Sequence, residues 1–154
     1  MTRITDTLRG EHGPLLALLA HCETAATKWE LADLLLAGRT LEAALLSHAE
    51  IENELLFGAL EAKVGCGGPT AAMRAEHDEI DAGLSSLGVA ADEAEARRIL
   101  LRVVHEARDH FAKEEQVLFP MAEQILGDEE LERQATAWAV RRGVALPARE
   151  ASFH

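Results

Sequence analysis

The sequence has no tyrosine, and aromatic residues make up only 4% of its 154 positions. The absence of tyrosine excludes chemistry that depends on a tyrosyl radical. Cysteine is scarce as well: Cys22 and Cys66 fit neither a CxxC motif nor a zinc-knuckle spacing. So few cysteines suit a reducing compartment.

Positive charge and long apolar runs are also lacking. Lysine and arginine number 15 against 27 acidic residues, which gives a net charge of −12. Binding to nucleic-acid phosphates needs a basic patch, so this balance argues against such a partner. No apolar run approaches the ~20 residues of a membrane span, and no basic stretch followed by an apolar run marks a signal peptide. We therefore expect no nucleic-acid partner, no membrane and a cytoplasmic location.

The residues that are abundant favour helix. Leucine, alanine, glutamate and arginine dominate, and no stretch alternates with period two over a useful length. Four long amphipathic helices are expected, with a kink at Pro120, at about residues 6–27, 30–63, 70–87 and 92–126. Gly127 and Asp128 end the fourth helix and cap a shorter one that runs to about residue 142, before an irregular tail.

Short loops between four long helices predict an all-α fold, an up-down-up-down four-helix bundle with a short additional C-terminal helix. We expect the bundle to occupy residues 1–127. The C-terminal helix and tail, residues 128–154, are expected to pack on the same domain.

A histidine and a glutamate four residues apart occur twice, as His48/Glu52 and His110/Glu114. On a helix such residues lie about 40° apart around the axis, so each pair offers an imidazole and a carboxylate to one point. A lone histidine precedes each pair in a repeated context. Arg9-Gly-Glu11-His12 resembles Arg74-Ala-Glu76-His77.

Both His/Glu pairs interrupt an apolar stripe. The stripe of the second helix reads Leu34, Ala37, Leu41, Leu45, His48, Glu52, Leu55, Ala59, and that of the fourth reads Ile99, Val103, Ala107, His110, Glu114, Val117, Met121. Such stripes face the bundle core, where a lone carboxylate would cost several kcal/mol. A bound cation would compensate the buried charge, and imidazole with carboxylate suits iron, zinc, copper or nickel better than magnesium or calcium. The candidate metal ligands are His12, His48, Glu52, His77, His110 and Glu114.

Single pieces of this pattern are weak evidence in an acidic chain. A histidine with an acid four residues later is more often a solvated helix contact, and lone core histidines are usually satisfied by ordinary hydrogen bonds. His105 with Asp109 is such a contact, because His105 lies about 140° from His110 around the helix. His21 lies about 180° from His12, and the terminal His154 has no evident role. Asp81, one turn after His77, is either an extra ligand or an acid at the surface edge.

Taken together, the order His12, His48-x-x-x-Glu52, His77, His110-x-x-x-Glu114 resembles the hemerythrin-like, HHE cation-binding domain family. The trailing Leu55-Leu56-Phe57 and Val117-Leu118-Phe119-Pro120 also resemble it, and the likeness covers about residues 5 to 126. The resemblance implies a non-haem di-iron centre, oxo- or hydroxo-bridged, inside the bundle. By position, it implies that His12 and His48 bind one iron, His77 and His110 bind the other, and Glu52 and Glu114 bridge them.

The chain departs from the oxygen-carrying hemerythrins at two positions. Met73 stands where they have a fifth histidine, and Glu114 follows His110 by four residues where they have an aspartate after five. Both differences argue against simple reversible oxygen carriage. At these two positions the chain resembles instead the bacterial branch of the family, whose members are linked to peroxide, oxygen, nitric oxide or iron handling.

Three functions remain open on the sequence. The first is a di-iron protein that binds or reduces a small oxidant, O₂, H₂O₂ or NO, in a pocket kept dry by apolar neighbours: Leu16, Leu45, Leu55, Ile80, Phe111 and Val117. The second is an iron- or oxygen-responsive sensor or regulator without turnover. The third is a helical interaction module whose histidines bind adventitious zinc. Ferritin-like proteins use Glu-x-x-His pairs, which are absent here. The sequence names no protein partner and no oligomeric state.

Overall fold

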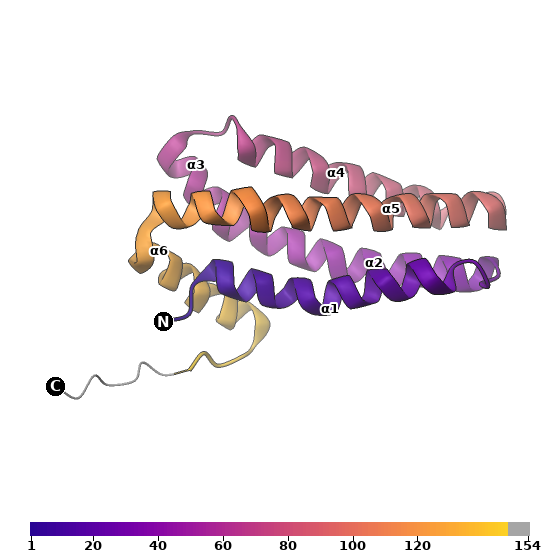
Figure 1. The fold of residues 1–154 in the computed structure, drawn as a ribbon, viewed down its shortest axis with the longest axis horizontal. Helices are drawn as coiled ribbons and strands as arrows, with labels where there is room; N and C mark the ends of the chain where they lie inside the picture. The colour runs from indigo at the N-terminus through magenta and orange to yellow at the C-terminus, as the bar shows by residue number, and fades with distance from the viewer. Residues whose placement is uncertain (148–154) are drawn as a thin grey trace.

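The computed structural model describes residues 1–147 as an antiparallel helical bundle (Figure 1). The four helices of the bundle run alternately in opposite directions, and the described residues contain no strand. They are α1 (Ile4–Ala25), α2 (Leu31–Ile51), α4 (Pro69–Gly88) and α5 (Glu93–Lys113). The predicted all-α, up-down-up-down bundle is confirmed.

The second and fourth helical runs each continue through a short π-helix. The π-helix η1 (Glu52–Phe57) joins α2 to α3 (Gly58–Val64), and η2 (Glu114–Leu118) joins α5 to α6 (Phe119–Arg142). Each π-helix begins at the glutamate of a His/Glu pair. A π-helix has i→i+5 hydrogen bonds and is commonly found at functional sites.

The π-helices correct the predicted apolar stripes. Their wider turn rotates the following residues around the helix axis, so the buried position advances by one residue. Leu56 and Leu60 are fully buried, whereas the predicted Leu55 and Ala59 are only partly buried. In the other run, Leu118 and Ala122 are likewise buried.

Val117 was predicted to lie on the buried stripe, but this residue is 59% exposed. The prediction that Val117 helps to keep the site dry was therefore wrong. Met121, its neighbour on the predicted stripe, is only partly buried. A hydrophobic pattern read with a constant period of 3.6 residues does not account for the extra residue in a π-helical turn.

The helices begin and end close to the residues that the sequence predicts. Helix α1 begins at Ile4, slightly before the predicted start, and the Asp6 carboxylate accepts a hydrogen bond from the Arg3 N–H at 3.0 Å. Asp92 caps α5 as predicted, accepting from the Glu95 N–H at 2.8 Å. Instead of the predicted kink at Pro120, the chain departs from α-helical geometry earlier, over the π-helix η2. Pro120 lies in the first turn of α6.

Gly127 divides α6 with a non-helical backbone, φ 75° and ψ 165°, which confirms the predicted break. Beyond it, the last part of α6 folds back beneath α1 (Figure 1). We call residues 128–142 the C-terminal segment. The chain from residue 144 to residue 147 has no regular structure, and the rest of the predicted tail, with His154, lies outside the described residues.

The core consists of two apolar clusters. One cluster gathers around Leu19, Leu41 and Val103, and the other around Leu8, Phe57 and Phe119. The clusters meet at the level where the predicted ligands lie, since His12 and His48 both contact Phe111 of the first cluster and His12 also contacts Phe119 of the second. A polar layer therefore crosses the middle of an otherwise apolar bundle.

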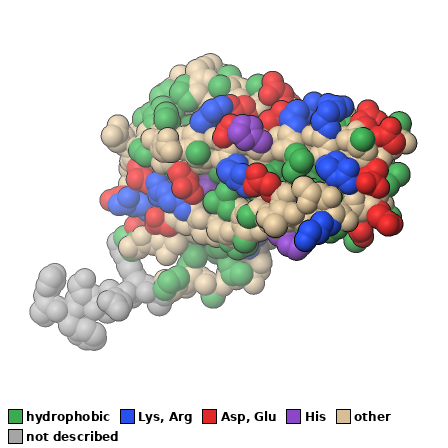
Figure 2. Space-filling view, turned by 45° about the vertical axis from the view of Figure 1, so that its right-hand side comes forward, with side chains coloured by type: hydrophobic (Ala, Val, Ile, Leu, Met, Phe, Trp, Pro, Cys, Tyr) green, Lys and Arg blue, Asp and Glu red, His purple; other side chains and the backbone are tan. Residues whose placement is uncertain are grey.

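The surface is strongly charged. On the face shown in Figure 2, acidic and basic side chains are interspersed and form no single basic patch. Among the described residues, no helix combines the length and apolar character that crossing a membrane requires.

Gly83 allows α4 and α5 to approach closely, and this generates a prediction. A Cβ at Gly83 would lie 2.7 Å from Val103 Cγ2, and valine is stiff at χ1. Gly83→Ala should lower the free energy of unfolding by about 1 kcal/mol, because overpacking of about 1–3 kcal/mol outweighs a helix-propensity gain of about 1 kcal/mol.

The matched control is Gly10→Ala in α1, where nothing lies within 4 Å of the added Cβ. Denaturant unfolding should show that this variant is more stable than the parent by about 0.5–1 kcal/mol. Equal effects of the two substitutions would contradict the close packing of α4 on α5.

Candidate metal centre

The six predicted ligand residues converge in the polar layer, one from each helical element that borders it. The two carboxylates, Glu52 and Glu114, stand at the first positions of η1 and η2 and are 0% exposed. His12, His48 and His110 are buried, and the His77 side chain is 8% exposed. The structure therefore brings together all six residues that the sequence singled out.

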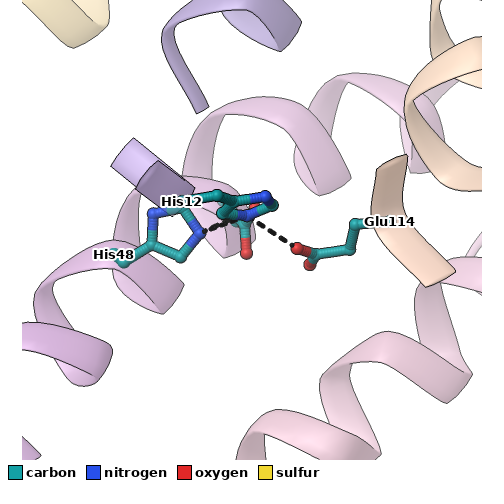
Figure 3. Close-up of side chains that lie close together, drawn as sticks. His12, His48 and Glu114 are labelled. Carbon is teal, nitrogen blue, oxygen red and sulfur yellow. Dashed lines mark hydrogen bonds and ion pairs between the residues drawn. The ribbon is translucent and has the colours of Figure 1, made fainter. Parts of the chain in front are cut away.

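His12 and His48 form the first histidine pair, with their Nε2 atoms 3.1 Å apart (Figure 3). The His12 Nε2 lies 3.2 Å from Glu114 Oε2. The His48 Nε2 lies 3.2 Å from Glu52 Oε1. Two nitrogens and two oxygens thus face a single point.

His77 and His110 form the second pair, with their Nε2 atoms 2.8 Å apart. The other oxygen of Glu52, Oε2, lies 3.3 Å from the His77 Nε2. The other oxygen of Glu114, Oε1, lies 2.8 Å from the His110 Nε2. Each carboxylate therefore extends one oxygen towards each histidine pair.

These contacts define two sets of four ligand atoms, and within each set all atoms lie within 4.8 Å of one another. The first set is His12, His48, Glu52 and Glu114. The second is Glu52, His77, His110 and Glu114. Because the two carboxylates belong to both sets, the geometry suits two neighbouring cations that share them.

The outer ring nitrogens fix the orientation of the imidazoles. Every Nδ1 faces an oxygen: Glu115 at 2.9 Å from His12, Glu11 at 2.6 Å from His48, Asn53 at 3.1 Å from His77 and Glu76 at 2.7 Å from His110. An Nδ1–H donated to such an acceptor leaves the Nε2 lone pair directed inward, as in metal-binding histidines.

A cation fits this arrangement because every inward atom is an electron-pair donor. With the inward Nε2 atoms unprotonated, no hydrogen-bond donor in the described part of the chain satisfies either oxygen of Glu52 or of Glu114. Buried polar atoms of native proteins are nearly always satisfied, so four unsatisfied carboxylate oxygens indicate a ligand. Nitrogen and oxygen donors in this combination suit a transition metal.

Without a metal, protons compensate part of the buried negative charge. Burial lowers the pKa of His48, but the Glu52 charge and the Glu11 hydrogen bond outweigh it and raise that pKa to about 10. Burial likewise opposes a rise in the pKa of His110 that hydrogen bonding to Glu114 produces. Burial raises the pKa of Glu52, and the neighbouring His48 and His77 lower it below its ordinary value. The negative electrostatic potential that binds these protons would also bind a metal cation.

Glu11 also accepts hydrogen bonds from two side chains other than His48. Its carboxylate accepts from Trp138 Nε1 at 2.7 Å and from Arg142 Nε at 2.6 Å. Burial raises the pKa of Glu11, but hydrogen bonds from His48, Arg142 and Trp138 outweigh it and lower that pKa to about 2. This carboxylate is therefore a charged acceptor at the back of His48.

The sequence interpretation missed the outer acceptors, although a signal for two of them was present. Glu11 and Glu76 occupy the same place in the repeated Arg-x-Glu-His motif, directly before His12 and His77. In each half, this glutamate supports the histidine of the following helix and not its own neighbour. Asn53 and Glu115 follow the two central glutamates but differ in type, so the repeat alone could not identify them.

The other two histidines of the described residues, His21 and His105, lie outside the centre. His105 pairs with Asp109 at 3.2 Å on the surface, where their side chains are 74% and 57% exposed. His21 is exposed and contacts Trp29 edge-on. The exposed Asp81 belongs to neither set of ligand atoms, as expected of an acid at the surface edge.

A cavity of about 90 Å³ leads from the surface to the centre beside α2 and α4. It reaches three candidate ligands, His48, His77 and His110. Apolar side chains line its walls: Leu45, Ile80, Leu84 and Phe111. Of the six apolar neighbours predicted from the sequence, Leu45, Ile80 and Phe111 hold this position. The cavity has room for a molecule of a few atoms.

A thermal-shift experiment tests the metal-binding arrangement. A metal that binds the folded chain at 100 times its dissociation constant should add about 2.7 kcal/mol of stability, and the melting temperature should rise accordingly. Glu52→Ala with Glu114→Ala should abolish this rise. His105→Ala removes an exposed histidine that also has an acid four residues later, and this variant should retain the full rise in melting temperature. Loss of the rise in both variants would contradict the assignment.

The sequence was compared with known families, curated proteins and solved structures. The description of the matching family is "Hemerythrin HHE cation binding domain", and the match covers residues 3–122. The searches of curated proteins and of solved structures gave no match. The matched region contains all six candidate ligands and ends before the C-terminal segment. The chain therefore belongs to the hemerythrin HHE cation-binding domain family.

Proposed function

We propose that this protein binds two non-haem iron ions and uses them to bind or reduce a small oxidant such as O₂, H₂O₂ or NO. His12 and His48 would hold one iron, and His77 and His110 would hold the other. Glu52 and Glu114 would be shared by both ions. In this proposal the chain forms one functional domain, to which the C-terminal segment belongs.

The observation that carries the proposal is the position of the two glutamates. Each is fully buried and has one oxygen within about 3.3 Å of an Nε2 atom in each histidine pair. A single cation would leave half of these oxygens without a partner in the low-dielectric core. Two cations that share both carboxylates satisfy all four oxygens and all four histidines.

The chain contributes positioning and exclusion of water. Phe111 stacks on His12 with ring centroids 4.2 Å apart, and Phe57 stacks on His77 at 5.5 Å. These rings fix the imidazole planes and cover the centre with apolar surface. Iron, when bound, supplies redox electrons and a coordination position open to a small molecule. Met73 has a thioether side chain and adds no nitrogen ligand; it lies in the second apolar cluster.

The cavity favours an uncharged ligand. Glu42, Asp78 and Asp81 line the cavity together with its apolar walls. Like charges raise the energy of an anion that approaches through this entrance, whereas a neutral molecule is unaffected. The size of about 90 Å³ and this charge together select O₂, NO or H₂O₂ over larger or anionic oxidants.

The metal and its reactivity can be tested on the purified protein. Elemental analysis should give close to two irons per chain, one for each set of ligand atoms. A charge-transfer band should shift on addition of azide, and the iron-loaded protein should bind NO or consume peroxide. Glu52→Ala with Glu114→Ala should lose both irons and the band. Unchanged metal content in that variant would show that the ligands are wrongly assigned.

The acidic entrance yields a separate prediction. Asp78→Asn with Asp81→Asn should increase the association rate of azide, an anion, roughly tenfold at low ionic strength. The difference should shrink in high salt, and the rate for uncharged NO should not change. Glu30→Gln with Asp33→Asn, which removes the same charge near the start of α2, is the control. An equal acceleration in both double variants would contradict entry past Asp78 and Asp81.

A further inference from the structure

The C-terminal segment, residues 128–142, is a separate helical unit that packs on the bundle. The non-helical Gly127 separates it from the first part of α6. Leu131, Ala135 and Ala139 are buried, and Trp138 packs against the second apolar cluster. Figure 1 shows the segment folded back under α1. Since the family match ends at residue 122, nothing in that match accounts for it.

Two side chains of this segment reach the carboxylate behind His48. Trp138 donates from Nε1 to Glu11 Oε1 at 2.7 Å. Arg142 donates from Nε to Glu11 Oε1 at 2.6 Å and from Nη2 to Glu11 Oε2 at 3.0 Å. The same Glu11 Oε2 lies 2.6 Å from His48 Nδ1. An unbroken series of short contacts therefore runs from the C-terminal segment to a candidate metal ligand.

Arg142 also contacts the helix that carries this ligand. Its Nη1 donates to the Ser47 hydroxyl at 2.6 Å, and its Nη2 lies 3.3 Å from the Ser47 carbonyl oxygen. Ser47 directly precedes His48. One guanidinium thus joins Glu11 on α1 to the backbone of α2, and it fixes both the acceptor and the position of the imidazole. The Arg142 side chain is only 25% exposed.

Within residues 1–147, the other half of the bundle has no such support. Glu76 accepts from His110 Nδ1 at 2.7 Å, as Glu11 does from His48. Among the described residues, Glu76 also pairs with Lys113, whose side chain is 56% exposed and lies on α5, the helix of His110 itself. The two halves repeat the inner contacts but differ at this outer position. The contact from the C-terminal segment is therefore not a requirement of the bundle and singles out His48.

We infer that Trp138 and Arg142 are positioning residues for the metal ligand His48, so that metal binding and docking of the C-terminal segment are coupled through Glu11. This inference rests on the proposed role of His48 as a ligand. A fixed carboxylate behind an imidazole sets its tautomer and orientation, and loss of such a partner typically weakens metal binding 10–100-fold. Coupling is reciprocal, so bound metal must strengthen docking of the segment by the factor by which docking strengthens metal binding.

The test compares Arg142→Met with Arg141→Met. Arg141 is adjacent and pairs with Glu54 on the surface, away from Glu11, so its variant is a matched control. Ferrous iron is titrated into each protein without oxygen and withdrawn with a chelator. In Arg142→Met, one of the two irons should be released at about tenfold lower chelator concentration, while the other is retained as in the parent. Arg141→Met should release both irons as the parent does.

Two further measurements separate positioning from simple loss of stability. Iron should slow amide hydrogen exchange across residues 128–142 in the parent and in Arg141→Met, and this protection should fall in Arg142→Met. Trp138→Phe keeps an aromatic ring against the second apolar cluster and removes the N–H donor, so it should weaken the same iron with little change in helicity. It also provides the test if Arg142→Met does not fold.

The outcomes are distinct. If the parent binds no iron, the proposed function fails and this inference falls with it. If the parent binds two irons and Arg142→Met and Trp138→Phe retain both with parental affinity, the proposed function stands and the coupling is wrong. Equal weakening of both irons would also overturn the inference, because it would indicate a general loss of stability.

Discussion

The structure depends on one electrostatic constraint: two carboxylates lie in the middle of the helical core and face only other electron-pair donors. Glu52 and Glu114 are fully buried, and the nearest polar atoms are the Nε2 atoms of four histidines. In a low-dielectric interior such a group is unfavourable unless positive charge enters it. Protons supply part of that charge in the metal-free chain. Metal cations would supply it in full and would leave the histidines neutral.

Other features of the fold are arranged around this layer. Both π-helices begin at its glutamates, and the widened turns re-aim the side chains that follow. Two apolar clusters close it from either end. Each imidazole is backed by an oxygen from a neighbouring helix, so the four long helices are cross-linked by polar contacts at one level. The halves of the chain repeat this plan, with differences at Asn53 and Glu115 and in the partners of Glu11 and Glu76.

The sequence was sufficient to predict the bundle and the six converging residues because both follow from helical periodicity. His48, Glu52, His110 and Glu114 interrupt apolar stripes, so their inward direction could be inferred without coordinates. The break at Gly127 was predictable because glycine readily adopts its positive φ.

Other features could not be predicted, for physical reasons. The π-helices add a residue to a turn with no distinct local signal, which moved the stripe from Val117 to Leu118. The roles of Glu11 and Glu76 depend on which helices are neighbours and on long side-chain rotamers. The contacts of Trp138 and Arg142 depend on how the chain folds back after Gly127, which no periodicity encodes.

In the proposed centre, two metal ions share Glu52 and Glu114. X-ray absorption at the iron edge of the loaded protein tests this sharing, because the method detects a second metal near the first. The spectrum should show nitrogen and oxygen ligands together with an iron scatterer at a distance of about 3.5–4 Å, as in other two-metal sites. A spectrum with the same light-atom ligands and no neighbouring iron would contradict it.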